Sequence, residues 1–147
     1  LPILRRSAPS SIVNVSSVAG RVARGNSGSY SAAKFALAGW TEALHAEERP
    51  HGVHVGLVLP GFVQTEGFPQ RELVSHPLAR RIVSRPEKVA EAIIQAGPGG
   101  KPERIVPRYY GIAVIAKAIA PWLVRRLTGG GGAMTPTTRP DAEDRGG

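Results

Sequence analysis

The chain has 147 residues, 41% of them hydrophobic, which suffices for one folded domain with its own core. It contains no cysteine, and this excludes a disulfide framework, thiolate chemistry and a cysteine-built zinc site. The 19 Lys and Arg against 11 Asp and Glu give a net charge of +8, which suits a phosphate-bearing cofactor, another polyanion or a solvated basic surface. No signal peptide is indicated at the N-terminus, so a cytoplasmic setting is expected.

The first 60 residues predict a strand–helix–strand unit after a short helical tail at Leu1–Arg6. Ser11–Val15 is an apolar, β-branched run, typical of a strand buried on both faces in a parallel sheet. A Gly- and Ser-rich loop follows, and Ser29 is a candidate N-cap for a helix over Tyr30–Arg49. Val53–Leu59 is a second apolar strand. The expected apolar face of the helix consists of Phe35, Leu37, Ala38, Trp40, Ala43 and Leu44. A βαβ unit of this kind predicts a parallel sheet.

The segment after the second strand is less regular. Phe62–Arg81 has no clear period, and Ser84 with Glu87 has the spacing of a capping box for a helix that ends before Gly97. Arg104–Pro107 is a short candidate edge strand. These elements fit one more helix and strand of the same α/β sheet.

The C-terminal region predicts a helical segment and a tail. Tyr109–Leu127 is apolar at helical spacing and is expected to bend or break at Pro121. Residues 128–147 are rich in Gly, Thr and Pro, and we expect them to be disordered. The predicted organisation is therefore one domain over 1–127 followed by a tail.

Three side chains could converge on one point. Tyr30 and Lys34 are four residues apart, so they share a helix face, and Ser17 follows the first strand at its carboxyl end. An isolated tyrosine hydroxyl is a poor acid at neutral pH, but a nearby ammonium stabilises its phenolate. A serine hydroxyl can position a carbonyl oxygen beside such a phenol. This set could protonate an oxyanion, but a cofactor has to deliver the hydride.

The chain resembles the classical short-chain dehydrogenases/reductases from Ile12 to about Pro107. The resemblance rests on Ser16-Ser17 at a strand end before Val18-Ala19-Gly20, on Tyr30-Ser31-Ala32-Ala33-Lys34, on the gap of 13 from Ser17 to Tyr30, and on Leu59-Pro60-Gly61 followed by Thr65. In that family the Tyr is the general acid/base, the Ser positions the substrate carbonyl, and the Lys binds the nicotinamide ribose and assists the Tyr. The resemblance therefore implies these roles for Tyr30, Ser17 and Lys34.

The resemblance also implies a cofactor, NAD or NADP, with the choice left open. In the family a Pro-Gly turn flanks the nicotinamide and a later threonine binds the carboxamide or a phosphate. The corresponding cofactor-binding residues here are Pro60, Gly61, the backbone of Val63, and Thr65, together with Tyr30 and Lys34. The implied substrate is a small molecule with a carbonyl or an alcohol group.

The family's first strand, glycine-rich phosphate turn and cofactor-selecting residue are not recognisable in the chain. We therefore interpret it as the C-terminal, catalytic part of a Rossmann-type doubly wound parallel sheet, with the N-terminal βαβ units missing. An inactive fragment or an oligomerisation module of such an enzyme is the alternative. The family commonly pairs the helix that bears its Tyr and Lys, so a homo-oligomer through Tyr30–Arg49 is expected.

Other functions are less well supported by the residues. His51 and His54 lie around a turn without a carboxylate partner, so no metal site is expected. No GxSxG elbow exists and the only Asp residues are Asp141 and Asp144, which disfavours a Ser-His-Asp hydrolase. Nucleic-acid binding is not expected. Tyr109–Leu127 could lie on an anionic membrane surface, although packing beside the substrate pocket or a dimer partner is favoured.

Overall fold

A computed structural model describes residues 1–23, 25–64 and 83–128 of the chain. Its centre is a parallel sheet of three strands, β1 (Ser10–Val15), β2 (Val53–Pro60) and β5 (Glu103–Val106), in the order β1-β2-β5. Ile12 lies opposite Val55 in the first pair, and Val58 lies opposite Arg104 in the second. The expected α/β sheet and its short edge strand are thereby confirmed.

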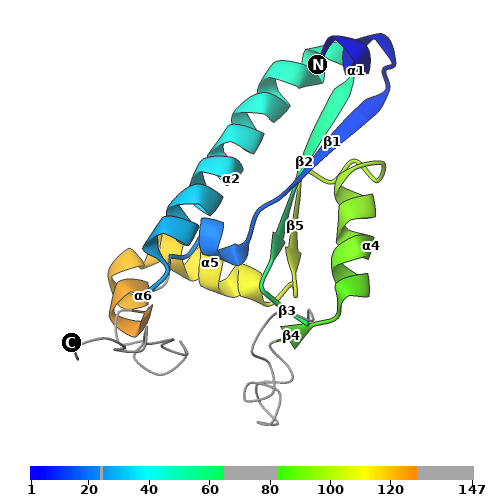
Figure 1. Cartoon of the computed structure of the whole chain (residues 1–147). Coiled ribbons are helices and arrows are strands. Elements are labelled where there is room, and N and C mark those ends of the chain that lie inside the picture. Colours follow the sequence, from blue (N-terminus) through cyan, green and yellow to red (C-terminus); the bar gives the residue numbers. More distant parts are fainter. Residues whose placement is uncertain (24, 65–82, 129–147) are drawn as a thin grey trace, which may run out of the picture.

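Two helices cover opposite faces of the sheet, as Figure 1 shows. Helix α2 (Gly28–Glu48) connects β1 to β2, and α4 (Pro86–Ala96) precedes β5. Alternate residues of β2 serve the two faces, because side chains alternate along a strand. Leu57 and Leu59 pack with Ala38 of α2, whereas Val58 packs with Ala92, Ala96 and Val106 on the α4 side. β2 is therefore the buried centre of the core.

The remaining elements are short and lie around this frame. They are α1 (Pro2–Arg6), the 3₁₀ turns η1 (Val18–Gly20) and η2 (Arg49–His51), the paired strands β3 (Phe62–Val63) and β4 (Val83–Ser84), and the helices α5 (Tyr110–Ile119) and α6 (Pro121–Thr128). The expected break at Pro121 is confirmed. Within the described ranges, no helix has both the length and the apolar character needed to cross a membrane.

An ion pair between the exposed Arg5 and the buried Glu48 holds the N-terminal end of the chain in place. Glu48 at the end of α2 is 1% exposed and accepts hydrogen bonds from the Arg5 guanidinium at 2.8 and 2.5 Å. These hydrogen bonds lower the pKa of the Glu48 carboxyl, and burial opposes them. The pair joins α1 to the far end of α2.

Several local expectations were wrong. The N-cap of α2 is Ser27 and not Ser29. Ser84 is buried in β4, so Arg85 takes the N-cap position of α4 and no Ser84–Glu87 capping box forms. β1 is only half-buried, because β2 is its single neighbour in the described sheet. Trp40 is 56% exposed, because Ala38, Thr41 and Leu44 form the buried face of α2. Of the tail predicted over 128–147, Thr128 belongs to α6, and 129–147 lie outside the described residues. Most of the irregular segment predicted over Phe62–Arg81 also lies outside them, since 65–82 are not described.

One part of the predicted architecture also needs correction here. The N-terminal βαβ units were expected to be missing. The chain begins its sheet with such a unit, since β1 pairs directly and in parallel with β2 and α2 is the crossover between them.

Candidate active site

Ser17 links the carboxyl ends of β1 and β2. It is 8% exposed and caps η1, accepting a hydrogen bond from the Ala19 amide at 3.1 Å. Its hydroxyl donates to the Pro60 carbonyl at 3.3 Å. Ligands of open α/β sheets bind at this edge of the strands. The structure therefore holds Ser17 beside the predicted Pro60–Gly61 turn, although the two are far apart in sequence.

Tyr30 and Lys34 lie in the first turns of α2. Lys34 Nζ donates to the Val15 carbonyl at 3.3 Å and lies 5.7 Å from the centroid of the Tyr30 ring. Tyr30 is 52% exposed, so its hydroxyl-bearing ring is open to solvent. Ser16 donates to the Lys34 carbonyl at 2.8 Å, a strand-end hydroxyl bonded to backbone. These contacts bring the Lys34 ammonium to the end of β1, two residues before Ser17, with the Tyr30 ring one helical turn away on the same helix.

Gly20 makes this close approach feasible. A Cβ at this position would lie 2.6 Å from the Lys34 carbonyl oxygen and 2.8 Å from Ser16 Oγ. Only a residue without a side chain lets η1 rest directly on α2 at Lys34. Sequence reasoning recognised Gly20 as part of a motif but not as a packing contact of the site.

A tyrosine from α5 supports the turn after β2. The Gly61 amide donates to the Val106 carbonyl at 2.7 Å, and a Cβ on Gly61 would lie 2.4 Å from the Tyr110 ring. Val63 is half-buried in β3, and Thr65 lies outside the described residues. Tyr110 was not among the predicted site residues, because no local pattern places the start of α5 against Gly61.

Arg21 joins four elements beside Ser17. Its guanidinium pairs with Glu42 of α2 and with Glu103 of β5, the latter at 2.6 Å. The Arg21 carbonyl accepts a hydrogen bond from Lys117 of α5 at 2.7 Å. This junction fixes the chain that leaves η1. The sequence carried no signal for it, since its partners are widely separated.

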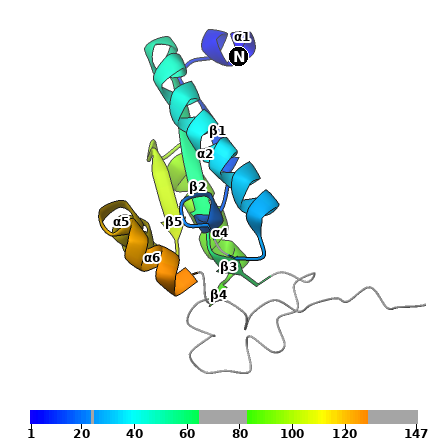
Figure 2. The same cartoon turned by 90° about the vertical axis from the view of Figure 1, so that its left-hand side faces the viewer.

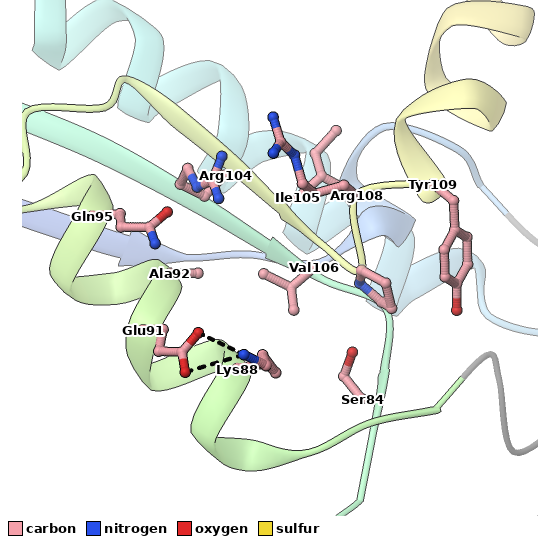
Figure 3. A pocket seen from close by; sticks show the side chains of 11 residues that line it. Ser84, Lys88, Glu91, Ala92, Gln95, Arg104, Ile105, Val106, Arg108 and Tyr109 are labelled. Atoms are coloured by element: carbon pink, nitrogen blue, oxygen red, sulfur yellow. Dashed lines mark hydrogen bonds and ion pairs between the residues drawn. The ribbon is translucent and has the colours of Figure 1, made fainter.

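A pocket of about 420 Å³ lies elsewhere, between α4 and the carboxyl end of β5 (Figure 3). Its lining includes Ser84, Lys88, Glu91, Arg104, Arg108 and Tyr109, and Lys88 pairs with Glu91 at 3.0 Å. Partial burial raises the pKa of Tyr109. None of the candidate catalytic residues lines this pocket, so it is separate from the site at the ends of β1 and β2.

Comparisons with known proteins agree on one family. Residues 1–73 match the family described as short chain dehydrogenase. The short-chain reductase protein NovJ of Streptomyces niveus is 52% identical over 64 residues, covering 42% of this chain and 23% of that protein. Dehydrogenase/reductase SDR family member 9 of Bos taurus is 31% identical over 119 residues, covering 81% of this chain and 31% of that protein. The chain thus spans about a quarter to a third of these curated relatives.

Solved structures show the same fold. A short-chain dehydrogenase from Burkholderia cenocepacia J2315, solved in complex with NADP, is 29% identical and superimposes with a TM-score of 0.70. The superposition covers 92% of this chain and 51% of that one.

The comparisons correct two expectations. We expected the resemblance to begin at Ile12 and to concern only the C-terminal, catalytic part of such a fold. The family match instead begins at residue 1, lies in the N-terminal half of this chain and contains the βαβ unit β1–α2–β2. The interpretation of the chain as a C-terminal part without N-terminal βαβ units is therefore wrong. The expectations of a parallel α/β sheet and of this family are confirmed: the chain belongs to the short-chain dehydrogenase/reductase family.

Proposed function

We propose that the chain takes part in NAD(P)-dependent interconversion of a ketone or aldehyde and an alcohol. One observation carries the proposal: hydrogen bonds hold Ser17, Lys34 and Pro60 at the carboxyl ends of β1 and β2, and the exposed Tyr30 ring lies 5.7 Å from the Lys34 ammonium. This is the chemistry of an acid/base site next to a ligand-binding edge.

The donors at this edge fit the ribose end of a nicotinamide cofactor. Tyr30 offers an exposed phenol and Lys34 an ammonium, and these groups can bind the two hydroxyls of a ribose. The Pro60–Gly61 turn and the backbone of Val63 would flank the nicotinamide, and Thr65 is the further proposed contact. When bound, this cofactor supplies or accepts the hydride. NADP, which the cited Burkholderia structure binds, is the first candidate.

The chain's own residues would handle the proton. Tyr30 donates its phenol proton to the substrate oxygen during reduction and takes it back during oxidation. Lys34 stabilises the phenolate that remains. Ser17 releases the Pro60 carbonyl and donates its hydroxyl hydrogen to the substrate oxygen, which orients that oxygen toward Tyr30.

Fluorescence titration of the 147-residue chain with NADPH and with NADH tests the proposal, followed by turnover on a panel of ketones and aldehydes. We expect saturable binding and slow reduction. Tyr30→Phe should abolish turnover but weaken cofactor binding only slightly, because it removes one ribose contact while Lys34 and the Pro60–Gly61 turn remain. Tyr109→Phe, at the separate pocket, is the matched control and should retain turnover. Turnover retained by Tyr30→Phe would refute the assignment.

A non-catalytic role is the second candidate. It is favoured by the limited span of the chain, 23% to 33% of the first three curated relatives. In that case α2 serves as an association surface, and Trp40 is its largest exposed side chain. A chain that is folded by circular dichroism but binds neither cofactor supports this second candidate over the first.

A further inference from the structure

Helix α5 presents an apolar stripe to the outside. Ile112, Ile115 and Ile119 follow each other at spacings of three and four and are between 60% and 79% exposed. Residues at these spacings share one helix face. Figure 2 shows α5 and α6 beyond β5, the edge strand of the sheet. The stripe therefore lies at the periphery of the described structure.

The single charged residue of α5 points the other way. Lys117 donates to the Arg21 carbonyl at 2.7 Å, and its ammonium lies 4.5 Å from the centroid of the Phe35 ring. A helix that faces water normally buries its apolar stripe and exposes its charges. α5 has the reverse polarity, so its outer face is built for an apolar environment.

Helix α6 directly follows α5 and carries an exposed aromatic residue and two exposed cations. Trp122 and Leu127 are 68% and 73% exposed, and Arg125 and Arg126 are exposed beside them. Tryptophan is favoured at the boundary between lipid and water, where arginine meets the headgroups. We call the exposed residues Ile112, Ile115, Ile119, Trp122, Arg125, Arg126 and Leu127 the α5–α6 surface.

The positive charge around the α5–α6 surface indicates which kind of partner it would bind. Residues 108–128 contain Arg108, Lys117, Arg125 and Arg126 and no Asp or Glu. A second copy docking through a two-fold contact would bring like charges together, because both copies present the same patch. An anionic surface gains from every one of the exposed cations.

We propose that the α5–α6 surface docks onto an anionic lipid surface. A helix of 10 residues is about 15 Å long, half the thickness of a hydrocarbon core, so α5 lies along the interface. Its isoleucine stripe and Trp122 enter the headgroup boundary, and Arg125 and Arg126 bind lipid phosphates or carboxylates. The sheet stays in the aqueous phase.

Co-sedimentation with vesicles tests this proposal. We expect the chain to bind vesicles of equimolar phosphatidylcholine and phosphatidylserine, to bind pure phosphatidylcholine far more weakly, and to dissociate as salt is added. The double variant Ile115→Glu/Ile119→Glu should lower the vesicle-bound to free ratio at least ten-fold, and so should Arg125→Glu/Arg126→Glu. Circular dichroism should show unchanged helix content, since all four side chains are exposed.

Ile94→Glu is the matched control, because Ile94 is 63% exposed on α4 outside the surface. It should bind vesicles like the unmodified chain. Two results would overturn the proposal: absence of binding to anionic vesicles at low salt, or binding that the two double variants leave unchanged. Self-association that Ile115→Glu/Ile119→Glu abolishes, without vesicle binding, would identify a second copy as the occupant and also overturn it.

Discussion

The contact of Gly20 with α2 can be tested by adding one methyl group. In Gly20→Ala the new Cβ would lie 2.6 Å from the Lys34 carbonyl oxygen and 2.9 Å from its carbon, whereas ordinary contact begins near 3.4 Å. Both atoms belong to helix backbone and cannot rotate away. η1 and α2 would therefore have to separate by about 0.8 Å. Overpacking of this kind costs about 1–3 kcal/mol.

Urea unfolding followed by circular dichroism measures this cost. With a slope of about 2 kcal/mol per molar urea, the midpoint should fall by about 0.5–1.5 M. Gly39→Ala in α2 is the control, since its Cβ would have no neighbour within 4 Å. It should raise the midpoint slightly, because alanine stabilises a helix by about 0.5–1 kcal/mol relative to glycine. A Gly20→Ala midpoint equal to that of the unmodified chain would refute the packing described here.

Three further predictions concern the core, the ion pair and α2. Leu59→Ala should lower the free energy of unfolding by about 2–5 kcal/mol, whereas Ile3→Ala, at a 72% exposed position, should change it by no more than about 0.5 kcal/mol. Equal effects of the two substitutions in urea unfolding would contradict the placement of Leu59 in the core. The pKa of the Glu48 carboxyl is lowered in the folded state, so the carboxylate stabilises the fold above its ordinary pKa of 4.5, and this contribution is lost as the pH falls below that value. Glu48→Gln should therefore flatten this part of the curve of unfolding free energy against pH. A curve that the substitution leaves unchanged would argue against the ion pair with Arg5. If α2 mediates a homo-oligomer, Trp40→Glu should shift the sedimentation coefficient to that of the monomer, and a chain that is monomeric without the substitution would end that proposal.

The strand–helix–strand frame could be predicted because its signals are local. The β-branched run at Ser11–Val15, the helix stop at Pro50 and the alternating apolar residues of Val53–Leu59 each act through neighbouring residues. The exposed side of α2 was not predictable in the same way. Trp40 fits an apolar helical pattern, but the face that packs is decided by the small side chains Ala38 and Thr41, which let α2 approach β2.

In the candidate site too, residues marked by a local sequence pattern were predictable and residues held by distant partners were not. Ser17, Tyr30 and Lys34 were predicted from their spacing, and the structure holds Ser17 and Lys34 at the ends of β1 and β2 with the Tyr30 ring near Lys34. Arg21 and Tyr110 were not found, because their partners lie in other elements and no periodicity marks them. Their roles follow only from the tertiary arrangement, and the catalytic assignment itself stays a proposal.

The hydrogen bond from Lys117 to the Arg21 carbonyl connects α5 to the loop that follows β1. Arg21 directly follows η1, whose first residue follows Ser17, so a displacement of α5 that preserves this bond pulls on the loop that carries the Ser17 hydroxyl. If a ligand at Ser17 changes the position of this loop, the same hydrogen bond would link its binding to the position of α5, and such a linkage would be reciprocal. A ligand that holds the Ser17 loop in place would, by the same bond, steady the outer helices of the protein.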